Sequence, residues 1–142
     1  MFGSSLLVAQ DNPWAGTWKL NVAKSKYTPG PGPQSATRTY EAQAAGVKST
    51  QEVTAADGSH ASVSFTANFD GKDYPLTGSS AIDAIALKRS GNTFEWTLKK
   101  GGKVVSTGKN TVSNDGKVMT YTAKGTNAKG EPTSSVQVFD KQ

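Results

Sequence analysis

The stretch SGNTFEWTLKKGGK, residues 90–103, contains one complete strand pattern between two turn signals. Phe94, Trp96 and Leu98 alternate with polar residues, so an extended chain would place all three on one face. Glycine at each end supplies the positive φ angle that tight hairpin turns require. The stretch therefore predicts a half-buried strand that hairpins join to its neighbours.

Similar turn signals divide most of the chain at nearly even spacing. Asp-Gly pairs stand at 57–58, 70–71 and 115–116, and runs rich in Thr, Val and Ser separate the turns. No stretch keeps a 3.6-residue apolar period, and the three prolines within residues 29–33 exclude a helix interior or a central strand there. The alternation predicts ten strands, at residues 16–22, 36–43, 47–55, 60–69, 72–76, 81–89, 93–99, 103–112, 118–124 and 134–141.

A meander of this length exposes two sheet edges unless it closes or stacks. The sequence therefore predicts an all-β fold, a single antiparallel up-and-down β-barrel of about ten strands. The 142 residues suit one domain, which we place at residues 11–142. Residues 1–10 are similar to the end of a signal peptide, which favours a periplasmic or secreted protein; the alternative is an unstructured tail.

Composition limits the available chemistry. The chain has no cysteine and one histidine, which excludes disulfides, thiolate sites and the usual zinc sites; we expect His60 on the surface beside a turn. The net charge of +5 is uneven, because residues 1–87 carry six basic and seven acidic side chains, whereas residues 88–142 carry ten and four. Most of these later lysines flank turns without interleaved aromatic residues, so we expect no specific nucleic-acid partner. No apolar run is long enough to span a bilayer.

Residues 16–20, Gly-Thr-Trp-Lys-Leu, begin the first predicted strand. Gly16 lets the chain turn sharply, and Trp18 can plug the closed end of a barrel, with Trp14 packed outside that plug. The Gly-x-Trp pattern resembles the calycin superfamily, and the five residues together resemble the opening of the intracellular fatty-acid-binding proteins. Further similarity to that family lies at residues 102–103, 115–118 and 136–141. The chain also resembles small exported bacterial lipocalin-like proteins.

The resemblance implies a ligand site inside the barrel. Fatty-acid-binding proteins hold a carboxylate with an Arg-x-Tyr motif on the last strand and an Arg two strands earlier. The matching positions here are Gln137, Phe139 and Lys109. A buried carboxylate needs paired charge and full hydrogen bonding, which these residues do not supply, so we expect a neutral or weakly polar apolar ligand. The two lid helices of the family have no counterpart in the Pro- and Gly-rich residues 23–34.

Three further polar residues leave alternatives open. Arg38 and Tyr40 share one face of their strand; they form either an interior clamp for an anion or, as we expect, a pair at the rim or outside. In an extended strand, Asp83 would lie on the same face as Ile85 and Leu87. If that face points inward, Asp83 would need Arg38 or Lys109 as its partner.

A ten-stranded barrel encloses more space than its side chains fill. The sequence therefore predicts non-enzymatic binding of a small hydrophobic molecule, for storage or transport, by a monomer without a cofactor. The candidate ligand contacts are Arg38, Tyr40, Phe65, Phe69, Ile85, Leu87, Phe94, Trp96, Lys109, Met119, Tyr121, Gln137 and Phe139. The alternatives are a filled barrel scaffold and a surface- or nucleic-acid-binding module that uses the basic C-terminal half. An enzyme is less favoured, because no catalytic triad, glycosidase carboxylate pair, phosphate loop or metal cluster is evident.

Overall fold

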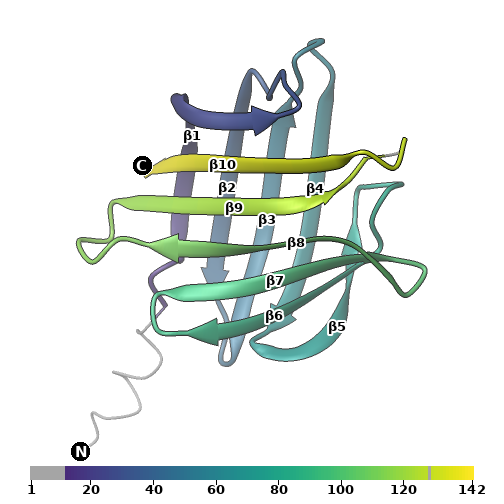
Figure 1. Cartoon of the computed structure of the whole chain (residues 1–142). Helices are drawn as coiled ribbons and strands as arrows, with labels where there is room; N and C mark the ends of the chain where they lie inside the picture. Colours follow the sequence, from purple (N-terminus) through teal and green to yellow (C-terminus); the bar gives the residue numbers. More distant parts are fainter. Residues whose placement is uncertain (1–11, 128) are drawn as a thin grey trace, which may run out of the picture.

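The computed structural model describes residues 12–127 and 129–142 (Figure 1). Ten antiparallel strands close into one barrel, each hydrogen-bonded to its neighbours in sequence, with β1 bonded to β10. The strands are β1 (Gly16–Thr28), β2 (Ser35–Ala42), β3 (Gly46–Thr54), β4 (His60–Asn68), β5 (Asp70–Thr77), β6 (Ala84–Ser90), β7 (Thr93–Lys100), β8 (Lys103–Val112), β9 (Val118–Thr126) and β10 (Pro132–Lys141). The predicted all-β barrel is confirmed. The expected signal-peptide remnant lies outside the described residues, and those residues include no helix that could cross a membrane.

Strand β1 is longer than predicted because it bends and serves two neighbours. Gly16 to Lys19 pair with β2, whereas β10 pairs with residues 18–21 and, past the bend, with residues 26–28 (Figure 1). The register along β10 shifts between Asn21 and Lys26. Ser25 fills this interruption, since its hydroxyl donates to the Asn21 carbonyl (2.8 Å) and accepts from the Val138 amide (3.0 Å). The bend completes the barrel without a lid helix.

The hairpin turns have the geometry that the Asp-Gly pairs predict. In the β8–β9 turn, Gly116 has a φ of 74°, and the Asp115 carboxylate accepts from the Lys117 amide at 3.1 Å. The hydrogen bonds from Ser113 and Lys117 hold the pKa of the exposed Asp115 below its ordinary value. His60 is exposed beside the β3–β4 turn, as expected, within 3.0 Å of the Thr54 hydroxyl. Such turns set the strand register locally.

Two tryptophans close one end of the barrel. Trp14 and Trp18 are fully buried, and the Trp18 indole donates to the Trp14 carbonyl at 2.9 Å. Trp18 is the plug that the sequence predicts. Trp14 does not lie outside it, because its ring packs on Phe69 and Phe94, with centroids 5.5 and 4.9 Å away. This aromatic cluster forms the floor of the interior.

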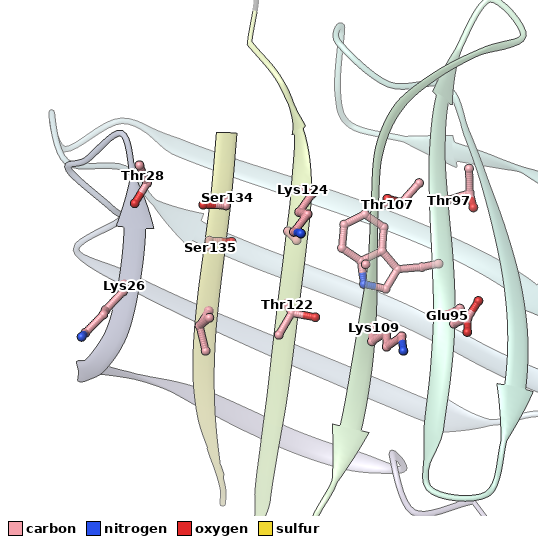
Figure 2. Close-up of a pocket in the computed structure, with 14 residues that line it drawn as sticks. Lys26, Thr28, Glu95, Thr97, Thr107, Lys109, Thr122, Lys124, Ser134 and Ser135 are labelled. Carbon is pink, nitrogen blue, oxygen red and sulfur yellow. The ribbon is translucent and has the colours of Figure 1, made fainter. Parts of the chain in front are cut away.

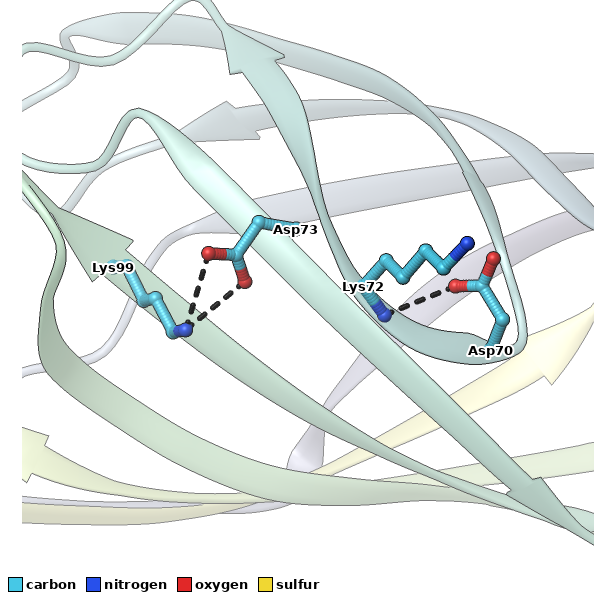
Figure 3. Close-up of polar contacts among 4 residues, drawn as sticks. All are labelled: Asp70, Lys72, Asp73 and Lys99. Carbon is cyan, nitrogen blue, oxygen red and sulfur yellow. Dashed lines mark hydrogen bonds and ion pairs between the residues drawn. The ribbon is translucent and has the colours of Figure 1, made fainter.

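Strand β5 is weakly attached on one side. It pairs with β4 at two positions, whereas an ion pair between Asp73 and Lys99 (3.0 Å) links it across β6 to β7 (Figure 3). Asp83 does not take the inward position considered for it: β6 begins after it, it is exposed, and its carboxylate accepts from the Gly101 amide at 3.0 Å. Asp83 therefore caps the β7–β8 turn and pairs with neither Arg38 nor Lys109.

Candidate functional site

Strand β2 carries a cation into the interior. Arg38 is 8% exposed and Tyr40 is 2% exposed, so the expectation of a rim or outer position is wrong. The register explains this, because Arg38 lies opposite Trp18 and Tyr40 lies opposite Ser49, both of which are fully buried. Paired residues in a sheet share a face. The interior clamp is thus the arrangement that the structure adopts.

The Arg38 guanidinium lies against aromatic rings. Its central carbon is 3.9 Å from the centroid of Tyr121 and 5.1 Å from that of Phe139. Burial lowers the pKa of Arg38, but interactions with Tyr121 and Tyr40 outweigh this and leave the pKa above its ordinary value. Burial raises the pKa of Tyr121 above its ordinary value, so this hydroxyl does not neutralise the charge of Arg38. Arg38 is therefore a buried cation at neutral pH.

No buried carboxylate accompanies this cation within residues 12–127 and 129–142. The buried polar or charged side chains among the described residues are Arg38, Ser49 and Asn110. An isolated charge inside a protein is unfavourable by several kcal/mol unless a counter-charge or hydrogen bonds compensate it. The aromatic faces supply part of that compensation, about 0.5–2 kcal/mol for each ring. A negatively charged hydrogen-bond acceptor would supply the rest of the compensation.

Several buried polar atoms have no hydrogen-bond partner among the described residues, including the Ser49 hydroxyl and the Asn12 side-chain oxygen. Asn110 is committed on both sides, since its oxygen accepts from the Trp14 indole (3.2 Å) and its amide donates to the Tyr40 hydroxyl (3.1 Å). The indole nitrogen of Trp96 and the hydroxyl of Tyr27 are buried without a partner among the described residues. Burial raises the pKa of Tyr27, and the charge of Arg38 partly opposes that rise. These donors lack the acceptors that buried polar groups normally have.

A hollow of about 60 Å³ remains inside the barrel. Its lining consists of Arg38, Tyr40, Gln51, Val63, Phe65, Leu76, Ile85, Phe94, Trp96, Leu98 and Tyr121. This volume admits a few water molecules, whereas pockets for drug-sized ligands measure about 300–1,000 Å³. The centre is occupied because Trp96 stacks on Tyr121, with centroids 4.9 Å apart and planes inclined by 9°, while Arg38 also covers Tyr121. Val63 and Leu98 are half-buried, so the hollow approaches solvent on their side.

The remaining candidate residues separate into two groups. Phe69, Leu87, Met119 and Phe139 pack within the core but do not border the hollow. Gln137 lies opposite Tyr121 in the register and is half-buried, and its amide donates to the Ser135 hydroxyl at 3.3 Å.

Lys109 is not an interior residue. It is exposed on the outer face (Figure 2), and its neighbours Gly108 and Asn110 face inward instead. The register between β7 and β8 shifts beyond Leu98, so Val105 has no partner there. This extra residue inverts the parity expected from the hairpin at Gly102. The candidate residues expected from the sequence did not include Asn110. Its only sequence signal is that it lies two residues before the apolar Val112, and therefore on the same face of the strand.

The comparisons with known proteins concern the fold. No protein-family model matches the chain, and no curated protein matches its sequence. Rv2717c from M. tuberculosis superposes with a TM-score of 0.60 at 15% identity, over 100% of this chain and 99% of that one. The ileal bile acid-binding protein of zebrafish complexed with cholic acid gives a TM-score of 0.56 at 11% identity, over 92% and 100%. The chain has the fold of that bile acid-binding protein.

A third solved structure, EF1p2_mFAP2b bound to DFHBI, also gives a TM-score of 0.56 at 11% identity, over 95% of this chain and 98% of the other. Two of the three similar barrels therefore carry a small molecule. The calycin-like resemblance of residues 16–20 and the closed ten-stranded topology agree with this fold.

Proposed function

We propose that this protein binds a small amphipathic acid inside its barrel and stores or transports it without catalysing a reaction. The observation that carries the proposal is the buried guanidinium of Arg38, which has no buried carboxylate beside it in the described part of the chain. A bound acid would supply the missing counter-charge through charge-assisted hydrogen bonds. The neutral ligand expected from Lys109 and Gln137 is less favourable, since the interior cation comes from a different strand.

The acidic group of the ligand would occupy the hollow beside Arg38, where the unpartnered indole N–H of Trp96 offers a second donor. The apolar body would extend along Val63 and Leu98, on the side where the hollow approaches solvent. Because 60 Å³ holds only the head group, binding requires these side chains to move apart. The cholic acid complex of a similar barrel supports this class of ligand. We also propose a monomer that acts in the periplasm or after secretion, which cell fractionation would test.

The test is a titration with cholate, with decanoate and with their methyl esters, followed by tryptophan fluorescence. Trp96 stacks on Tyr121, so an occupied hollow changes its emission. We expect each acid to bind about 10- to 100-fold more tightly than its ester, the range for a hydrogen bond to a charged group. Arg38→Met should remove this preference, whereas Lys48→Met on an exposed position of β3 should keep it.

Two results would contradict the proposal. Equal affinity for acids and esters in the unaltered protein would show that Arg38 does not select the ligand. No fluorescence change with any of the four compounds at millimolar concentration would favour the filled scaffold.

A further inference from the structure

The outer face of the barrel carries two parallel rows of side chains that cross five strands (Figure 2). The hydrogen-bond register aligns each row from β7 through β8, β9 and β10 to the second half of β1. The first row is Glu95, Lys109, Thr122, Val136 and Lys26. The second row is Thr97, Thr107, Lys124, Ser134 and Thr28. Successive strands lie about 4.8 Å apart, so each row is about 19 Å long.

A groove of about 740 Å³ runs between the two rows. The residues between them face the interior, where Gly108 lies against the Trp96 ring. Trp96, Gly108, Ala123 and Ser135 border the floor of the groove, and the outward side chains of the two rows form its walls. The rows stand two residues apart along each strand, about 7 Å. An extended molecule can lie in this groove across the strands.

The walls combine positive charge with hydroxyl groups. Three lysines and one glutamate contribute a net charge of about +2, and five of the remaining six side chains are Thr or Ser. Within the described residues, none of these lysines belongs to an ion pair. Val136, at 44% exposure, is the single apolar side chain of the two rows. This lining matches a ligand with many hydroxyl groups and several negative charges.

We infer that the groove binds a linear acidic oligosaccharide, a chain of uronic acid units, across strands β7 to β10 and β1. The ammonium groups would pair with carboxylates, and the Thr and Ser hydroxyls would donate to and accept from sugar hydroxyls. A single-stranded nucleic acid fits less well, because neither row has an aromatic side chain on which bases could stack, and Trp96 at the floor is only 2% exposed. A membrane surface fits less well, because the site is concave and has one apolar residue to insert.

The test uses oligogalacturonate of four and eight units, with the fully methyl-esterified octamer as a neutral control and a nine-nucleotide single-stranded DNA, whose phosphodiesters match the charge of the acidic octamer, as an equally charged control. Binding is measured by calorimetry at low salt, and the site is located by amide chemical-shift changes. We expect the acidic octamer to bind more tightly than either control, with shifts confined to the two rows. The interior site is not required, so Arg38→Met should bind the octamer as well as the unaltered protein does.

Matched variants separate this site from general attraction to a basic surface. Lys124→Gln and Lys26→Gln should each weaken octamer binding about two- to fivefold, a usual range for an exposed ion pair. Lys72→Gln and Lys117→Gln, exposed elsewhere, should have no effect. Thr107→Val keeps the shape and β-propensity of the side chain but removes its hydroxyl, and should weaken binding about two- to tenfold.

The inference fails if the DNA binds as tightly as the acidic octamer, or if all four lysine variants weaken binding equally. It also fails if Thr107→Val leaves the affinity unchanged, since the interaction would then be that of any polyanion with positive charge. Absence of octamer binding at millimolar concentration would overturn it directly.

Discussion

Replacement of Arg38 by methionine should make the protein more stable while it removes the acid site. The guanidinium is 8% exposed and shares the interior with no buried carboxylate. Desolvation of the guanidinium is unfavourable by several kcal/mol, and hydrogen bonds to Tyr40 and Tyr121 offset part of it. The rings of Tyr121 and Phe139 return about 2–3 kcal/mol in total, judged from distances of 3.9 and 5.1 Å to their centroids. A methionine sulfur on the same rings would regain about 1 kcal/mol. We therefore expect the free energy of unfolding to rise by about 1–2 kcal/mol.

The assay is urea unfolding followed by tryptophan fluorescence, with a two-state fit. The midpoint should rise while the slope stays constant, because the area exposed on unfolding hardly changes. Lys48→Met on the outer face should shift the free energy by less than about 0.5 kcal/mol. A loss of more than about 1 kcal/mol in Arg38→Met would refute the reasoning. Such a loss would mean that Tyr40 and Tyr121 compensate the charge of Arg38 fully, so that the site does not need an anion.

Three further predictions concern the barrel itself. Gly108→Ala should lower the free energy of unfolding by about 1–3 kcal/mol in urea titrations and disturb the Trp96 emission, because a Cβ there meets the Thr122 carbonyl and the Trp96 ring. An unchanged urea midpoint would contradict this, because it would show that β8 and β9 move apart easily to admit the added methyl group. Asn110→Ala should lower the free energy of unfolding by about 2–4 kcal/mol, since the substitution removes the hydrogen-bond partner of the Trp14 indole and of the Tyr40 hydroxyl. The exposed Thr111→Ala should have little effect. The depressed pKa of Asp115 contributes stability above the unfolded-state pKa of about 3.9 that is lost as pH falls through the lower folded-state pKa. Melting temperatures from pH 5 to pH 2 should therefore fall less steeply in Asp115→Asn; parallel curves would contradict this.

The strand series was predictable from local residues. Alternation at residues 93–99 and glycine in the turns placed the strands within a few residues, because the period of two and the positive φ angles are local properties. Trp18 was placed correctly for a related reason, since a large ring next to a sharp glycine turn has one suitable position at the end of a barrel.

The interior chemistry was less accessible to the same reasoning. Arg38 was expected at the rim because a charged side chain beside polar threonines gives no inward signal, and only its pairing with Trp18 decides the face. Lys109 was expected inside because the family resemblance assigns its position by counting residues from the hairpin at Gly102. One unpaired residue in β8 moves every later residue of that strand to the opposite face. The volume of the hollow was also out of reach, since it depends on how Trp96 and Tyr121 stack across two non-adjacent strands.

By itself, the order of residues determined how many strands form, where the chain turns and which tryptophan closes the barrel, because each of these depends on a few consecutive residues. Only the tertiary structure decided which polar side chains enter the interior and which line the outer groove. A shift of one residue between strands exchanges the two faces of a sheet, and that register is set by contacts between segments far apart in the chain.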